Sequence, residues 1–78
     1  MKHVAIYTTP QCAYCQKAKI FFNERDIAFT EYNVATDAVR RQEMLNRSGQ
    51  MTVPVIDIGS TIVVGFDRLR IKELLGLA

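Results

Sequence analysis

The strongest constraint on the fold is the order in which two patterns alternate along the chain. Short β-branched or aromatic runs are typical of strands, and apolar side chains three or four residues apart are typical of helices. The strand patterns occupy residues 4–7, 27–34, 53–58 and 61–64. The helix patterns occupy residues 12–22, 37–48 and 67–78. The predicted order of elements is therefore βαβαββα.

This order predicts an α/β fold with one mixed sheet. The first strand, helix and strand form a crossover unit, which places two strands parallel. Only Gly59-Ser60 separates the last two strands, and a two-residue turn of this kind is typical of an antiparallel hairpin. We therefore expect a four-stranded mixed sheet flanked by three helices, with helices on both of its faces. Functional residues of open α/β sheets usually follow the carboxyl ends of strands, as residues 8–12 do here.

Local signals also predict how the helices begin, end and pack. The residues expected to pack on the sheet are Tyr14, Ala18, Phe21, Phe22, Val39, Met44, Leu45, Ile71, Leu74, Leu75 and Ala78. For Tyr14 the alternative is an exposed position beside the cysteines, where it could flank an incoming disulfide. Thr36 or Asp37 is expected to cap the start of the second helix, and Gly49 its end. Asp67 is expected to cap the start of the third helix.

Length and composition exclude several classes of protein. The chain has 78 residues, so we expect residues 1–78 to form a single domain around one marginal core. A hydrophobic content of 49% excludes disordered and low-complexity classes, and a formal charge of +2 is too small to indicate a nucleic-acid or membrane partner. The apolar runs are far shorter than the roughly 20 residues of a membrane-spanning helix. With no secretory signal pattern, we expect a cytoplasmic monomer.

The only two cysteines, Cys12 and Cys15, lie at the start of the first predicted helix. A bridge across so short a loop removes little entropy from the unfolded chain, so the pair is not a structural staple. Zinc needs four ligands, and the chain adds only His3; haem attachment needs a histidine where Gln16 stands. A redox pair that cycles between dithiol and disulfide is predicted, and zinc shared across a homodimer stays open.

Three separated motifs resemble the glutaredoxin family. They are Ile-Tyr-Thr-Thr-Pro-Gln-Cys-Ala-Tyr-Cys at 6–15, Ser-Gly-Gln-Met-Thr-Val-Pro at 48–54 and Val-Gly-Phe-Asp at 64–67. The resemblance covers essentially the whole chain and is greatest for short glutaredoxin-like redoxins of the YruB type. It implies a thioredoxin fold, a cis peptide bond before Pro54, and no bound metal or prosthetic group.

The resemblance also implies a function and a set of site residues. The expected activity is thiol–disulfide oxidoreduction, in which protein or glutathione mixed disulfides are reduced through a reversible Cys12–Cys15 disulfide. Glutathione is the implied co-substrate, and disulfide-containing proteins are the implied partners. The implied substrate and glutathione contacts are Tyr14, Thr52, Val53, Pro54, Gly65, Phe66 and Asp67.

The position of Cys12 at the start of a helix suits the attacking thiol. There its sulfur meets free N–H groups of the first turn and the positive end of the helix dipole. We therefore expect its pKa to lie below the value of about 8.5 of a free cysteine. Cys15, one turn further in, is expected to be less accessible and to resolve the mixed disulfide.

Three positions differ from the usual glutaredoxin pattern. Ala13 stands where proline is usual, Thr9 where many members have a lysine that contacts glutathione, and Phe66 where a cysteine is common. These differences leave two other functions open. One is a dedicated electron carrier reduced by thioredoxin reductase, for example one that serves ribonucleotide reductase. The other is an iron–sulfur or zinc carrier that uses Cys12 across a dimer.

The first two predicted helices carry four cations whose roles can be predicted, Lys17, Lys19, Arg40 and Arg41. Lys17 and Lys19 are expected to be solvated helix charges. Arg40 and Arg41 are expected to form a solvated helix face, with contact to a glutathione carboxylate as the alternative.

Overall fold

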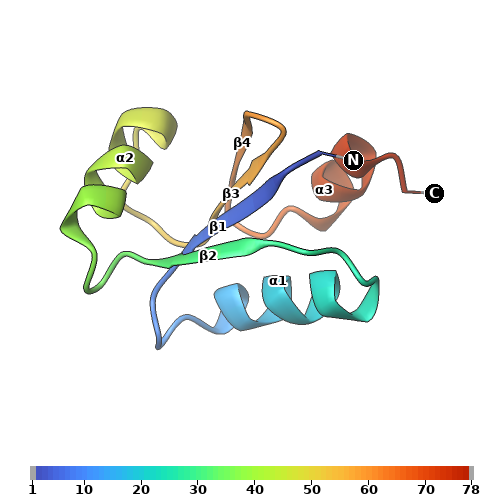
Figure 1. Ribbon diagram of the computed structural model, residues 1–78, viewed down its shortest axis with the longest axis horizontal. Helices are drawn as coiled ribbons and strands as arrows, with labels where there is room; N and C mark the ends of the chain where they lie inside the picture. The colour runs from blue at the N-terminus through green and yellow to red at the C-terminus, as the bar shows by residue number, and fades with distance from the viewer. Residues whose placement is uncertain (1, 78) are drawn as a thin grey trace.

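Seven elements follow one another in the predicted order in the computed structural model, which describes residues 2–77 (Figure 1). The strands are β1 (Val4–Thr8), β2 (Thr30–Asn33), β3 (Val55–Ile58) and β4 (Thr61–Val64). The helices are α1 (Ala13–Glu24), α2 (Ala38–Ser48) and α3 (Arg68–Leu75). No helix in this part of the chain has the length and apolar character needed to cross a bilayer.

The sheet is mixed, as predicted, with the strand order β2-β1-β3-β4. β1 pairs in parallel with β2, placing Ala5 opposite Thr30. The pairs β1–β3 and β3–β4 are antiparallel, and Gly59 and Ser60 close the second of them with φ values of 55° and 75°. Both values are positive, which is the geometry that a two-residue hairpin turn requires. The crossover and the hairpin were therefore both predicted correctly.

Helices cover both faces of the sheet, also as predicted, and each face has its own apolar cluster (Figure 1). The cluster under α1 and α3 contains Val4, Ile6, Ala18, Phe21, Phe22, Ile56, Ile58, Val63 and Ile71. The smaller cluster under α2 contains Tyr7, Val34, Met44 and Val55. Because residues of a strand alternate between the two faces, β1 contributes to both clusters.

Two strands are shorter than their sequence patterns. β2 begins at Thr30 and not at Ile27, because its only partner is β1 and the pairing of these strands starts at Ala5 and Thr30. Ile27 instead packs against the larger cluster from a loop. β3 begins at Val55 and not at Val53, because its pairing with β1 ends there and Pro54 has no N–H group to donate.

The predicted packing face is wrong at Val39, and at Tyr14 the alternative, an exposed position, is confirmed. Val39 is 76% exposed, whereas Met44, five residues later, is buried. Five residues place these two side chains about 140° apart around the helix axis, so both cannot face the sheet. Tyr14 is 61% exposed and does not continue the packing face, whereas its neighbour Cys15 is fully buried. Ala78, also expected on a packing face, lies outside the described residues.

The predicted caps are confirmed. Asp37 accepts a hydrogen bond from the backbone N–H of Arg40, and Asp67 accepts one from the backbone N–H of Arg70. Gly49 ends α2 with a φ of 73°, and its N–H donates to the carbonyl of Leu45 at 2.8 Å. These contacts satisfy backbone groups that a helix end leaves free.

Candidate active site

The two cysteines lie at the N-terminus of α1, where they form a disulfide. Cys12 is the N-cap residue, and its Sγ accepts a hydrogen bond from the backbone N–H of Cys15 at 3.1 Å. The Cα atoms of the two residues are 5.2 Å apart. Cys12 is half-buried, and Cys15 is fully buried. The predicted difference in access is therefore present in the structure.

The loop after β1 directs Cys12 into its capping position. The N–H of Cys12 donates to the carbonyl of Thr9, and the carbonyl of Cys12 accepts the bond from Gln16 that starts the helix. The sulfur thus lies beside N–H groups that have no partner inside the helix. Such groups favour a negatively charged sulfur over a neutral one.

A shallow pocket of about 300 Å³ lies beside this helix start, lined by Tyr14, Val53, Pro54, Gly65 and Phe66. These residues come from three separate segments of the chain. The peptide bond between Val53 and Pro54 is cis, as predicted, and the carbonyl of Pro54 accepts a hydrogen bond from the N–H of Gly65 at 2.8 Å. That bond joins two of the three segments. The structure therefore brings five of the predicted contact residues together.

Thr52 and Asp67 border this pocket in the sequence but do not line it. Both side chains already have partners: Thr52 donates to the side-chain oxygen of Gln50 at 3.0 Å, and Asp67 caps α3. Both residues are exposed, so an incoming group can still reach them.

The two arginines proposed for a glutathione carboxylate are engaged within the chain. Arg40 forms an ion pair with Glu43 at 3.0 Å, and its guanidinium lies 4.2 Å from the centre of the Tyr32 ring. Arg41 donates to the carbonyl of Val34 at 3.1 Å. Both remain partly exposed, so they do form a partly solvated face, but each guanidinium already has a partner within the chain.

Lys19 is not the solvated charge that was expected. Its Nζ lies 2.9 Å from Glu31 Oε2, which in addition accepts a hydrogen bond from the hydroxyl of Thr8 at 2.7 Å. The Thr8 hydrogen bond, with a smaller contribution from Lys19, lowers the pKa of the Glu31 carboxyl. This cluster ties α1 to β1 and β2.

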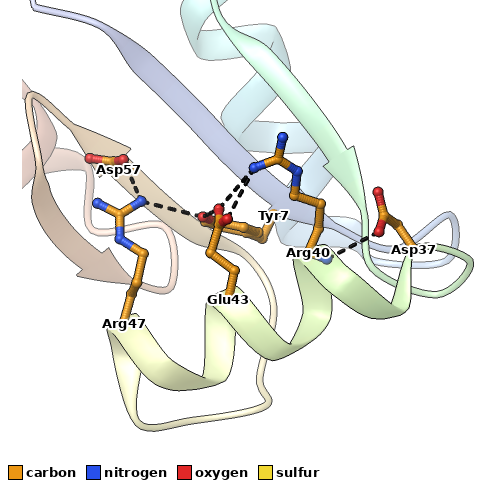
Figure 2. Close-up of polar contacts among 6 residues, drawn as sticks. All are labelled: Tyr7, Asp37, Arg40, Glu43, Arg47 and Asp57. Atoms are coloured by element: carbon orange, nitrogen blue, oxygen red, sulfur yellow. Dashed lines mark hydrogen bonds and ion pairs between the residues drawn. The ribbon is translucent and has the colours of Figure 1, made fainter.

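Figure 2 shows a polar network under α2 that the sequence analysis missed. The buried Tyr7 donates its hydroxyl to Glu43 at 2.5 Å and accepts a hydrogen bond from Arg47, which binds Asp57 at 2.7 Å. Burial raises the pKa of the Tyr7 hydroxyl, and the hydrogen bond from Tyr7 lowers the pKa of Glu43. The available signal was a polar group in each of two apolar strand patterns, at Tyr7 and Asp57. The network holds α2, and with it the start of the loop that leads to Pro54.

Residues 2–77 contain no group of three His, Cys, Asp or Glu side chains arranged to hold a metal ion.

The sequence model of the family described as glutaredoxin matches residues 4–63. The chain belongs to the glutaredoxin family. It is 42% identical to an uncharacterized glutaredoxin-like 8.6 kDa protein of Clostridium pasteurianum, over 92% of this chain and 96% of that protein. It is 39% identical to glutaredoxin 3 of Escherichia coli K12, over 88% of this chain and 83% of that protein.

The fold is thioredoxin-like, as the resemblance implied. The structure matches a mutant of the thioredoxin-like protein BC3987 with a TM-score of 0.92 and 28% identity, over the full length of both chains. The chain is therefore a glutaredoxin-family disulfide oxidoreductase with a redox-active CxxC disulfide, Cys12–Cys15.

Proposed function

We propose that this glutaredoxin-family protein reduces protein disulfides and glutathione mixed disulfides, with Cys12 as the nucleophile and Cys15 as the resolving thiol. The observation that carries the proposal is the difference in burial between the two sulfurs at a helix N-terminus. In the reduced protein the Cys12 thiolate attacks one substrate sulfur and releases the other as a thiolate. Cys15 then attacks the Cys12 sulfur, releases the reduced substrate, and leaves the Cys12–Cys15 disulfide.

The pocket beside the cysteines supports this role. The backbone of Thr52 and Val53 precedes the cis bond and offers N–H and C=O groups that can pair with an extended substrate chain. Tyr14 and Phe66 supply apolar surface on the other sides of the pocket. A substrate cysteine held here lies beside Cys12.

Glutathione fits one end of this site better than the other. Gly65, Phe66 and Asp67 lead into the N-terminus of α3, which offers N–H groups for a carboxylate and one anion for an ammonium group. At the opposite end Thr9 replaces a lysine, and Arg40 and Arg41 are engaged elsewhere. One exposed charge contact is worth about 1 kcal/mol, or less than tenfold in affinity. We therefore expect weakened glutathione binding.

The lack of a free cation among the described residues at the Thr9 end of the site favours a second candidate, a dedicated electron carrier reduced by thioredoxin reductase. Such a carrier needs the two cysteines but no cation for the glycine carboxylate of glutathione. The 42% identity to a glutaredoxin-like 8.6 kDa protein, over nearly all of its length, supports membership of the short YruB-type branch. In both candidates the protein is a monomer without a bound group.

Two coupled assays separate the candidates. NADPH oxidation is measured with glutathione and glutathione reductase in one assay and with thioredoxin reductase in the other, using the same disulfide substrate. We expect measurable but modest turnover with glutathione, and none in either assay for Cys12→Ser. Turnover with thioredoxin reductase alone would replace the first candidate by the second. Wild-type protein that is inactive in both assays would contradict both.

A further inference from the structure

A second groove, here called the α1–α3 groove, continues the pocket beside the cysteines. It has a volume of about 220 Å³ and is lined by Lys17, Ile20, Phe21, Glu24, Phe66 and Arg68. Phe66 lines both this groove and the pocket beside Pro54, so the two hollows are neighbours that share this residue. A chain that enters the pocket can therefore continue along α1.

Apolar side chains follow one side of α1 along this path. Tyr14 is 61% exposed and Ile20 is 55% exposed, and Lys17 lies between them at a spacing of three residues. Residues three apart are neighbours on a helix surface. The path from the cysteines into the groove is thus a strip of exposed apolar surface with a cation at its middle.

Three cations lie against aromatic rings in the groove or next to it. Lys17 lies 5.1 Å from the centre of the Tyr14 ring, while Arg68 and Arg25 lie 5.8 Å and 3.9 Å from the centre of the Phe21 ring. None of these three cations is a member of an ion pair formed within residues 2–77. Of the lining residues, Glu24 is the one that carries a carboxylate. The groove therefore has an excess of positive charge that the chain itself does not neutralise.

We propose that the α1–α3 groove binds the segment of a protein substrate that adjoins its reactive cysteine, where this segment carries acidic residues followed by an apolar one. The proposal rests on the proposed function, since the substrate sulfur must react with Cys12. The acidic side chains bind Lys17 and Arg68, and the apolar side chain packs on Ile20.

The spacing along α1 sets where these side chains lie in the substrate. Lys17 follows Cys12 by five residues, or about 7.5 Å of helix, and Ile20 follows it by eight, or about 12 Å. An extended chain advances about 3.3 Å per residue. Acidic residues two and three positions from the substrate cysteine therefore reach Lys17, and an apolar residue four positions away reaches Ile20. Glutathione has one residue on each side of its cysteine and is too short to use the groove.

The test uses synthetic peptides whose single cysteine forms a mixed disulfide with thionitrobenzoate. When Cys12 attacks the peptide sulfur, thionitrobenzoate is released as a coloured thiolate. One peptide has Asp at the second and third positions after the cysteine and Leu at the fourth, and its partner has Lys in place of Asp. A second pair carries the same residues before the cysteine. The bimolecular rate of colour release by the reduced protein is measured at low and at high salt.

We expect the Asp peptide of one pair to react about tenfold faster than its Lys partner at low salt, and this preference to shrink at about 1 M salt, where charges are screened. Lys17→Glu with Arg68→Glu should reverse the preference. Lys2→Glu with Lys72→Glu makes the same change in net charge outside the groove and should preserve it. Equal rates for Asp and Lys peptides in both pairs, or reversal by both double variants, would overturn the proposal.

Bis(2-hydroxyethyl) disulfide, which is too small to reach the groove, is assayed with the same protein samples. If every variant reduces this compound while the peptides show no charge preference, the groove proposal fails and the proposed function stands. If the wild-type protein reduces neither the compound nor the peptides, the proposed function itself fails.

Discussion

At the cysteines, one helical turn separates two residues of the same type with different surroundings. Cys12 caps α1 and is half-buried, whereas Cys15 lies inside the first turn and is fully buried. The sulfur that an incoming disulfide can reach is therefore that of Cys12. This difference in access supports the proposed roles of Cys12 as nucleophile and Cys15 as resolving thiol.

We expect Cys12→Ser to abolish disulfide reduction, because the remaining thiol, Cys15, is fully buried and cannot make the first attack. Cys15→Ser should accumulate mixed disulfides with protein substrates, since nothing resolves them, and should keep part of its activity on glutathionylated substrates. Non-reducing mass spectrometry of the variants after incubation with substrate measures the trapped species. Equal loss of activity in both variants on every substrate would contradict the assignment.

The helices α2 and α3 both begin after an N-cap aspartate, so comparing them can distinguish the capping role of Asp67 from its proposed role in substrate binding. Each begins after an aspartate whose carboxylate accepts a hydrogen bond from a backbone N–H three residues later. Asp67, at the start of α3, adjoins Phe66 of the pocket, while Asp37 of α2 does not line it. The two aspartates are therefore a matched pair.

Asp37→Ala and Asp67→Ala should each lower the free energy of unfolding by about 1 kcal/mol, the usual effect of losing an N-cap. Only Asp67→Ala should also lower glutathione-coupled turnover, because the proposed glutathione site uses Asp67, and not Asp37, for the ammonium group. Urea unfolding and the glutathione reductase assay measure the two effects. If both variants lose turnover to the same extent, Asp67 acts as a cap alone.

Across the whole molecule, one polar cluster on each face joins helices to the central strand β1. On one face Glu31 accepts from Thr8 of β1 and pairs with Lys19 of α1. On the other, Glu43 of α2 accepts from Tyr7 of β1 (Figure 2). Hydrogen bonds from Thr8 and Tyr7, respectively, contribute most to lowering the pKa values of these two carboxyls below 4.5.

Stability should therefore decrease in acid. The folded state favours the ionised forms of Glu31 and Glu43, so their contribution is complete well above pH 4.5 and is lost as the pH falls through the lowered pKa values. Urea unfolding at a series of pH values measures the slope. Glu31→Gln combined with Glu43→Gln should flatten it, and Glu24→Gln, outside both clusters, should leave it unchanged. An unaltered slope in the double variant would show that other groups cause the acid sensitivity.

Features that depend on neighbours in the chain were predictable from the sequence. The caps at Asp37, Gly49 and Asp67 and the turn at Gly59-Ser60 are set by contacts across two to four residues, so local residue types suffice to identify them. The placement of the cysteine pair at a helix start follows from the same local patterns. Strand and helix order followed from periodicity, which also depends on nearby residues alone.

Tertiary structure alone decided which side chains are free to bind and which are already engaged. Tyr7 and Arg47 meet across 40 positions of the chain, and Lys19 and Glu31 meet across 12. Strand ends followed the same rule, because β2 can extend only as far as its pairing with β1. The sequence therefore determined the element order and the redox pair. Packing between distant segments decided that Lys19 is paired with Glu31 while Lys17 and Arg68 face an open groove, because a charge is free only where no partner reaches it.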